Sequence, residues 1–291
     1  MNPTVLDDLQ IEEIRKLAET KRRSLGFIGE TPLANDIFVI LENLDIILLE
    51  YPIESANERP AFSAALIYSE DGDEKLGFLG LNTADYYDNQ IFAIAHELYH
   101  YFTKSESHLS RLQEELSDPV ESKANRFAAE FLLPEYVLKR IILHDFKIPS
   151  LETIQLKTIL RFIARLHCTW WLPYRSLVRR LYEAKAINSA QFDLLYSINE
   201  RDEESDYYRT GLATDKYIFS KLNQPTRNIG TSPERIETII RNFEDDLIDE
   251  DQLTEILSLF NKTPGEFGYE VEICEDDLSE LDTLFRQGDY Q

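Results

Sequence analysis

The segment His96-Glu97-Leu98-Tyr99-His100 is the most informative stretch of the chain. Residues four positions apart lie on the same face of an α-helix, so the imidazoles of His96 and His100 can bind one metal ion. Glu97 follows His96 by one step around the helix, and its carboxylate can reach a water molecule beside that metal. We therefore predict a helix that carries two zinc ligands and, in Glu97, the general base of a hydrolase.

The residues around this motif predict that the helix is buried. Between residues 91 and 102 a broad apolar stripe recurs at helical spacing: Ile91, Ile94, Ala95, Leu98 and Phe102. Both histidines lie beside this stripe, where an unpaired polar group costs about 1–3 kcal/mol. A shared metal ion removes that cost, which favours a metal site over a pair of ordinary core histidines.

A catalytic zinc ion has three protein ligands and one open position, so a third ligand is expected further along the chain. The candidates are Glu106, His108, Glu114, Glu115, Asp118, Glu121 and Glu130. Asp118 followed by Pro119 is typical of a helix start, and we expect this helix to run to residue 133. Its apolar stripe consists of Ala124, Phe127, Ala128, Phe131 and Leu132.

Helical phase selects among the candidates on this second helix. Steps of about 100° per residue place Glu121 at the edge of the apolar stripe, so its carboxylate is the predicted third ligand. Three charged residues fall on the opposite face, which we expect to be solvated: Lys123, Arg126 and Glu130. Asn125, one turn after Glu121, can orient a ligand or serve as a surface amide. His108 is the rival third ligand, because imidazole is the other common zinc donor.

Two blocks of the sequence resemble the ImmA/IrrE family of metallo-endopeptidases. The first is FAIAHELYHYF at residues 92–102, and the second is the pattern E-x-x-A-N-x-F-A-A-x-x-L-L-P at residues 121–134. The resemblance covers about residues 30–200 and implies that Glu121 is the third ligand, in agreement with the helical phase. It also implies a substrate, a helix-turn-helix repressor of mobile-element or stress genes. Tyr99 stands where the family usually has glycine, and we expect it to face away from the metal.

The residues before the motif predict an α+β fold. We expect a helix at residues 35–44 and strands at 45–51, 61–69 and 76–83, with a turn at 69–74 between the last two strands. The predicted architecture is a small, mainly antiparallel sheet packed on a zinc-binding helix bundle, followed by helix-turn-helix-like and further helical segments. An edge strand beside the site is expected to pair with an extended substrate, although the sequence does not show which edge is free.

We predict three domains along the chain. They are a zinc metallopeptidase domain at residues 1–146, a helix-turn-helix-like subdomain at 147–199 and an acidic, mainly helical domain at 200–291. The last boundary rests on a run of charged residues that begins at Asn199. Further helices are expected at residues 215–222, from Ser232 onward, at 251–260 and at 276–286.

The charge of the chain points to a basic protein partner. The 291 residues include 30 basic and 54 acidic ones, a formal net charge of −24 at pH 7, which repels nucleic-acid phosphate. Residues 161–185 are locally basic, with Arg161, Arg165, Arg175, Arg179, Arg180 and Lys185. Because of this basic segment, a DNA-binding regulator remains an alternative function for the chain. We expect the segment to serve packing or partner docking instead.

We expect a cytoplasmic protein with no membrane partner. The sequence has no signal-peptide pattern and no apolar run of membrane-spanning length, and its cysteines, Cys168 and Cys274, lack metal or redox spacing. The predicted function is an intracellular zinc endopeptidase that cleaves a basic helix-turn-helix repressor. Two further alternatives stay open: a non-proteolytic zinc-containing regulator that acts by partner binding, and the toxin of a two-component operon.

Overall fold

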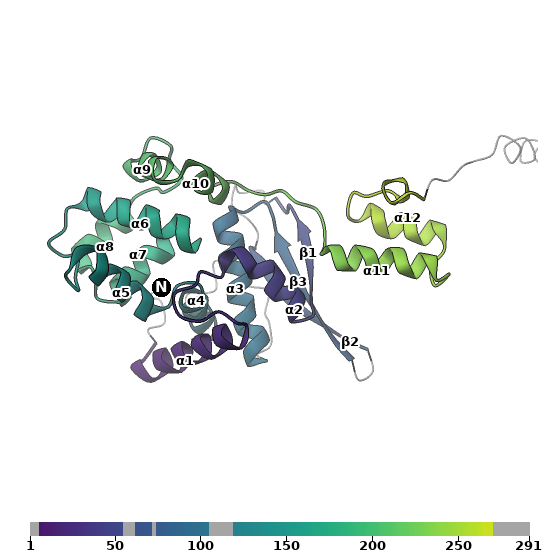
Figure 1. The fold of residues 1–291 in the computed structure, drawn as a ribbon, viewed down its shortest axis with the longest axis horizontal. Helices are drawn as coiled ribbons and strands as arrows, with labels where there is room; N and C mark the ends of the chain where they lie inside the picture. Colours follow the sequence, from purple (N-terminus) through teal and green to yellow (C-terminus); the bar gives the residue numbers. More distant parts are fainter. Residues whose placement is uncertain (1–5, 55–61, 72–73, 105–118, 270–291) are drawn as a thin grey trace, which may run out of the picture. The chain divides into compact units, whose positions relative to one another are not determined.

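The computed structural model describes residues 6–54, 62–71, 74–104 and 119–269 (Figure 1). The chain divides into two compact units, Met1–Ser232 and Pro233–Gln291. The domain boundaries predicted after residues 146 and 199 both lie inside the first unit and stay predictions. In the described ranges, no helix is both long enough and apolar enough to cross a lipid bilayer.

The first unit combines helices with one small sheet, which confirms the predicted α+β class. Its elements are α1 (Asp8–Ser24), η1 (Ala34–Asp36), α2 (Ile37–Asn43), β1 (Ile46–Tyr51), β2 (Ala64–Asp71), β3 (Glu74–Asn82), α3 (Tyr87–Thr103), α4 (Pro119–Leu132), α5 (Glu135–Phe146), α6 (Leu156–Trp170), α7 (Tyr174–Glu183), α8 (Ser189–Tyr196), α9 (Asp206–Thr214) and α10 (Lys216–Leu222). The predicted helix at residues 35–44, the three strands and the helix at 215–222 are all present, with shifted ends.

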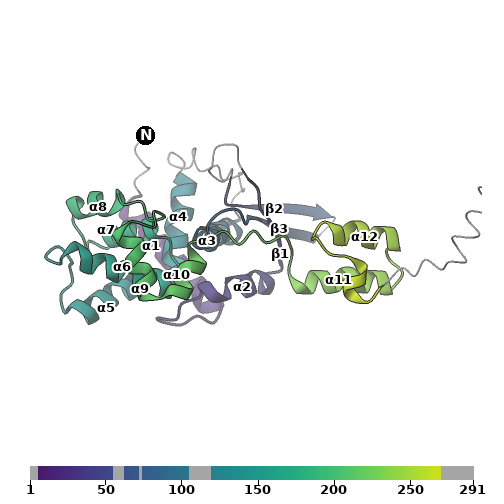
Figure 2. The ribbon, with the colours of Figure 1, turned by 90° about the horizontal axis from the view of Figure 1, so that it is seen from above.

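The sheet has the strand order β1-β3-β2 and is mixed. Strands β2 and β3 pair antiparallel, with Leu66 opposite Leu79, while β1 and β3 pair in parallel, with Leu48 opposite Leu79. These three leucines form a buried row on one face, because alternate residues of a strand point to the same side. Helix α3 contacts β2 and β3, and both ribbon views show it beside the sheet (Figures 1 and 2).

Helices α3 and α4 pack against each other through aromatic side chains. The ring of Tyr99 on α3 lies 5.6 Å from that of Phe127 on α4, and Phe102 lies 6.1 Å from Phe127 and 6.4 Å from Phe131. Phe127 and Phe131 stack on each other with their centroids 5.3 Å apart. Such interlocked rings resist sliding of one helix along the other, so they determine which turn of α4 faces which turn of α3.

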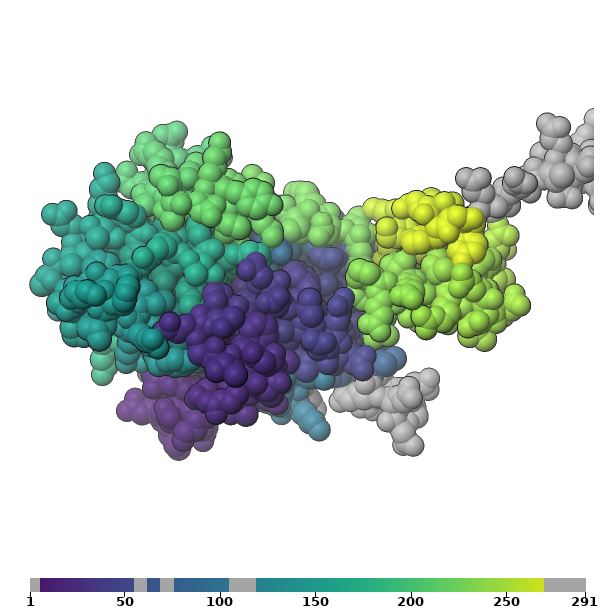
Figure 3. Space-filling model, viewed as in Figure 1, coloured from purple at the N-terminus to yellow at the C-terminus, as the bar shows by residue number. Residues whose placement is uncertain are grey.

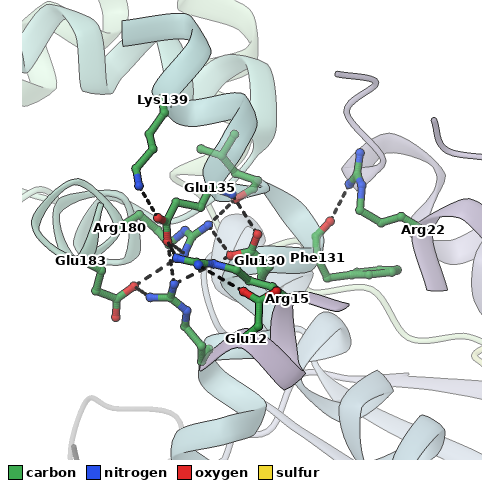
Figure 4. A network of polar contacts seen from close by, with 11 residues as sticks. Glu12, Arg15, Arg22, Glu130, Phe131, Glu135, Lys139, Arg180 and Glu183 are labelled. Atoms are coloured by element: carbon green, nitrogen blue, oxygen red, sulfur yellow. Dashed lines mark hydrogen bonds and ion pairs between the residues drawn. The ribbon is translucent and has the colours of Figure 1, made fainter. Parts of the chain in front are cut away.

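The opposite face of α4 is buried as well, so the expectation that Arg126 and Glu130 are solvated was wrong. Arg180 of α7 is fully buried and donates a 2.7 Å hydrogen bond to Glu130, while Arg126 contacts Glu135 at 2.9 Å and also Glu183. Figure 4 shows this ionic cluster between α1, α4, α5 and α7. Periodicity within one helix identifies a polar face, but whether other helices supply countercharges for it depends on the tertiary fold.

Helix α1 completes the ionic cluster from the N-terminal side. Its Arg15 contacts Glu135, and Lys139 approaches the same carboxylate to 2.7 Å. The space-filling view shows the purple N-terminal part of the chain lying directly against the teal helices (Figure 3). Burial alone would raise the pKa of Glu135, but hydrogen bonds from Lys139 and Arg15 and the attraction of nearby guanidinium groups outweigh it and lower this pKa to about 2.

Residues 224–230, which we call the strap, tie the end of the first unit to its sheet. Gly230 and Glu50 of β1 exchange two main-chain hydrogen bonds of 2.9 and 3.1 Å. The carbonyl of Gln224 accepts a 3.0 Å bond from the amide of Tyr87 at the start of α3. The strap therefore occupies the outer edge of β1 at Glu50 and holds the first turn of α3.

A second tie to α3 comes from a buried ion pair just after the predicted boundary at residue 199. Asp88, fully buried in the first turn of α3, accepts hydrogen bonds of 2.7 and 2.9 Å from Arg201. The Nε2 atom of His167 lies 3.2 Å from the same carboxylate. Burial alone would raise the pKa of Asp88, but the positive charge of Arg201 outweighs it and lowers that pKa. This carboxylate therefore links α3 to α6 and to the segment before α9.

The described part of the second unit is a helical hairpin of α11 (Pro233–Glu244) and α12 (Glu250–Ser258), followed by η2 (Pro264–Phe267). These helices match those predicted from Ser232 onward and at residues 251–260. The predicted helix at 276–286 lies outside the described residues. Within the described part, the buried apolar side chains are Ile236, Leu253 and Leu257.

Cys168 is the cysteine within the described residues, and its surroundings are those of a structural rather than a reactive thiol. Its side chain is half-buried on α6, and burial raises the pKa of its thiol to about 12. A thiol with such a pKa stays protonated and unreactive near neutral pH. Cys274 lies outside the described residues.

Replacing Arg180 tests the buried ionic cluster. Arg180→Ala leaves Glu130 buried without its closest cation, and we expect a loss of about 3–5 kcal/mol in the free energy of unfolding. Arg179→Ala, which removes the exposed neighbouring arginine, is the matched control and should change stability by less than about 0.5 kcal/mol. Urea denaturation at pH 7 measures both, and equal losses in the two variants would contradict a special role for the buried arginine.

The lowered pKa of Glu135 predicts how stability depends on pH. The carboxylate stabilises the fold fully above its ordinary pKa of 4.5, and this contribution disappears as the pH falls toward about 2. The wild-type protein should therefore lose stability between pH 4.5 and 2 more steeply than Glu135→Gln, which cannot titrate. Parallel pH dependence of the urea midpoints of the two proteins would show that the carboxylate does not have this lowered pKa.

Candidate metal site

Helix α3 presents two imidazoles from adjacent turns toward one point. The Nε2 atoms of His96 and His100 lie 3.4 Å apart, and the ring centroids are 5.3 Å apart. Both side chains are buried in the protein interior. The four-residue spacing thus produces the juxtaposition predicted from the sequence.

Glu121, in the first turn of α4, brings its carboxylate to the same point. One oxygen lies 2.9 Å from Nε2 of His96, and the other lies 3.5 Å from Nε2 of His100. The three possible ligand atoms all lie within 4.8 Å of one another, and all three residues are buried. The structure therefore brings together the three residues predicted as ligands, in an arrangement that could hold a metal ion.

The chemistry of these groups fits a divalent cation. The Nδ1 atom of His96 lies 3.1 Å from the amide oxygen of Asn125, an acceptor that favours the tautomer with the ring proton on Nδ1. The Nε2 lone pair of His96 then faces the carboxylate of Glu121, an arrangement that repels unless a cation lies between them. Two imidazole nitrogens and one carboxylate oxygen are a common ligand set for catalytic zinc. Asn125 supplies the orienting hydrogen bond that such a histidine needs.

Glu97 points toward the sheet and is nearly fully buried. Its carboxylate accepts a 3.1 Å hydrogen bond from the main-chain amide of Leu66 in β2. The strand therefore positions the predicted base, and β2 is the terminal strand that reaches the site. No side-chain pattern in the sequence indicates the role of Leu66, because its bond to Glu97 uses a main-chain amide.

The remaining residues that we singled out in the sequence are Tyr99 and the ligand candidates at residues 106–118. Tyr99, which we expected to face away from the metal, packs its ring on Phe127 and also contacts the ring of His100 edge-on, with 5.7 Å between the centroids. His108, the rival third ligand, lies outside the described residues. So do the other early candidates on the same segment: Glu106, Glu114, Glu115 and Asp118.

Three of the six cations in the basic segment at residues 161–185 pair with carboxylates of the same chain. Arg165 contacts Asp145, Arg175 lies 3.2 Å from Glu200, and Arg180 is buried in the ionic cluster. Within the described residues, the remaining cations of the segment form no ion pair: Arg161, Arg179 and Lys185. Carboxylates of the chain thus already neutralise half of the predicted basic patch, which weakens the case for DNA binding.

Comparison with known families agrees with the geometry of the site. Residues 58–157 match a peptidase family model described as the IrrE N-terminal-like domain. This range contains all four site residues: His96, Glu97, His100 and Glu121. Residues 58–157 are therefore similar to a peptidase domain of the ImmA/IrrE type, as the sequence motifs indicated. A search of curated protein sequences gives no match.

Metal content tests the ligand assignment. We expect Glu121→Ala to lose most of the bound metal found in the wild-type protein, because it removes one of three ligands. Asn125→Ala should weaken metal affinity by about 10–100-fold, because the His96 ring loses its orienting bond. Lys123→Ala, on the same helix, is the control. Elemental analysis after dialysis against a graded chelator measures all three, and full metal retention in Glu121→Ala would remove this residue from the ligand set.

Proposed function

We propose that this protein is a cytoplasmic zinc endopeptidase that hydrolyses a peptide bond in a basic helix-turn-helix repressor and so relieves repression of mobile-element or stress genes. The observation that carries the proposal is the convergence of His96, His100 and Glu121, with Glu97 held beside them by β2. The peptidase family match supports the hydrolytic part of the proposal. The net charge of −24 supports a basic partner, because opposite charges steer association.

In the proposed mechanism, His96, His100 and Glu121 hold the zinc ion. A bound zinc ion supplies Lewis acidity that polarises the scissile carbonyl and makes water a stronger nucleophile. The Glu97 carboxylate accepts the proton of the attacking water and then delivers it to the nitrogen of the leaving amine. Its hydrogen bond from Leu66 keeps one oxygen occupied and so limits the directions in which the other oxygen can point.

The edge-strand prediction becomes more specific. The strap pairs with β1 at Glu50, whereas β2 passes beside Glu97. A peptide that lies extended along β2 would bring a main-chain carbonyl toward the carboxylate of Glu97 and the three ligands. We propose this direction of approach for the substrate, with main-chain hydrogen bonds giving affinity and side-chain pockets giving specificity.

Glu97→Gln is the decisive variant for catalysis. The glutamine oxygen can still accept the hydrogen bond from Leu66, but the side chain cannot take a proton. We expect cleavage to fall by at least about 10²–10⁴-fold, while metal content and unfolding temperature stay at the wild-type level. Cleavage rate, elemental analysis and thermal denaturation measured on the same preparations test this, and turnover at the wild-type rate would eliminate Glu97 as the base.

The substrate class is tested with small helix-turn-helix proteins encoded beside the gene for this chain. Each is purified and incubated with the zinc-loaded protein, and mass spectrometry locates any cut. Cleavage at one bond, abolished by Glu97→Gln and by a chelator, is the expected result. Binding without cleavage by any metal-loaded preparation would favour the non-proteolytic regulator instead.

A further inference from the structure

The face of the sheet opposite α3 carries a row of apolar side chains. Ile47 of β1 lies beside Phe78 of β3, and Phe78 lies beside Ile67 of β2, because these residues pair in the strand register. Each of them neighbours a member of the buried leucine row and therefore points the other way. Leu76, two residues before Phe78, belongs to the same outer face.

Much of this outer row is open to solvent. The side chain of Ile67 is 57% exposed and that of Leu76 is 40% exposed, while Ile47 and Phe78 are half-buried. The outward face of a sheet in a water-soluble fold is usually polar, with apolar residues reserved for the covered face. A contiguous apolar row that crosses the sheet and is exposed at Ile67 of the edge strand and at Leu76 therefore marks an interaction surface.

Charge selects the kind of partner for this surface. Residues 44–82, which contain all three strands, include eight acidic and two basic residues. A second copy of the chain would bring the same excess of negative charge to the contact, which disfavours a dimer through this face. A partner with apolar side chains set among basic ones complements both features.

Strand β2 places this surface next to the site. Leu66 and Ile67 are consecutive residues, and they point to opposite faces of the same strand. The amide of Leu66 bonds to Glu97, while the side chain of Ile67 stands in the exposed row. A protein held on the outer face would therefore lie against the strand that borders the proposed base.

We propose that the apolar row of Ile47, Phe78, Ile67 and Leu76 is the docking surface for the basic protein substrate. This inference rests on the proposed function, because it assigns a recognition surface to the same hydrolytic site. The surface captures the folded substrate through apolar contacts, and the acidic excess of the segment that forms the sheet steers the basic partner toward it. Recognition would then depend on residues that take no part in the chemistry.

The test uses the full chain with Glu97→Gln, so that binding is measured without cleavage. The probe is a purified small, basic helix-turn-helix protein. The double substitution Ile67→Ser and Leu76→Ser replaces two exposed side chains, and the control is Leu143→Ser on α5, where the leucine is 54% exposed. We expect the double variant to bind at least about tenfold more weakly and the control to bind as Glu97→Gln does.

Further measurements distinguish a loss of docking from a loss of folding in the double variant. Thermal denaturation and metal content of the double variant should equal those of the control, and binding of the parent should weaken as salt rises. Equal affinity of the double variant and the control would overturn the docking surface. Two other results would also overturn it. In the first, the parent sediments as a dimer and the double variant as a monomer, which assigns the row to a second copy. In the second, the substitutions make the chain's own C-terminal residues more sensitive to protease, which assigns the row to those residues.

The same data separate this inference from the proposed function. If the wild-type protein binds the probe through Ile67 and Leu76 but never cuts it, the docking surface stands and the hydrolytic proposal fails. If the wild-type protein cuts the probe and the double variant binds it unchanged, the hydrolytic proposal stands and the docking surface fails.

Discussion

The packing of α3 against α4 is the contact on which the rest of the structure depends. His96 and His100 come from one helix and Glu121 from the other, so the ligand set exists only at one relative position of the two. A slip by one helical turn would displace the carboxylate by about 5.4 Å, farther than any ligand atom can compensate. The interlocked rings of Tyr99, Phe127 and Phe131 oppose that slip with close-packed contacts. Aromatic packing and metal geometry are therefore two consequences of the same interface.

Helix α4 carries two buried carboxylates that differ in where their positive partners come from. Glu130 faces guanidinium groups supplied by the chain itself, so its negative charge is balanced once α7 has packed. Glu121 faces the Nε2 atoms of two imidazoles instead, and a cation bound among these three groups would balance its charge. A buried carboxylate turned toward neutral donors is thus the physical signature that separates the site from the structural ionic cluster on the same helix.

This difference also explains what the sequence alone could predict. The four-residue spacing of His96 and His100 and the helical phase of Glu121 are local properties, and the structure brings these residues together as expected. Helical phase also placed Glu130 on a polar face of α4. It could not predict that Arg180 of α7 packs against this face and buries Glu130. The bond from Leu66 to Glu97 and the strap along β1 are main-chain contacts between distant segments, which side-chain patterns do not encode. Local periodicity therefore predicted the ligands but missed the contacts that position them.

The strand β2 connects chemistry and recognition through the two-residue period of a β-strand. Because Leu66 and Ile67 are neighbours, any shift of β2 by one residue against β3 would exchange the two faces. Such a shift would turn the apolar row inward and at the same time move the amide that positions Glu97. The antiparallel pairing of β2 with β3, which places Leu66 opposite Leu79, therefore stabilises the base and the proposed docking surface together. The position of Glu97 and the proposed docking surface would be independent if they lay on separate loops. Here both depend on the same strand register, so a substitution that shifts β2 against β3 would disturb both.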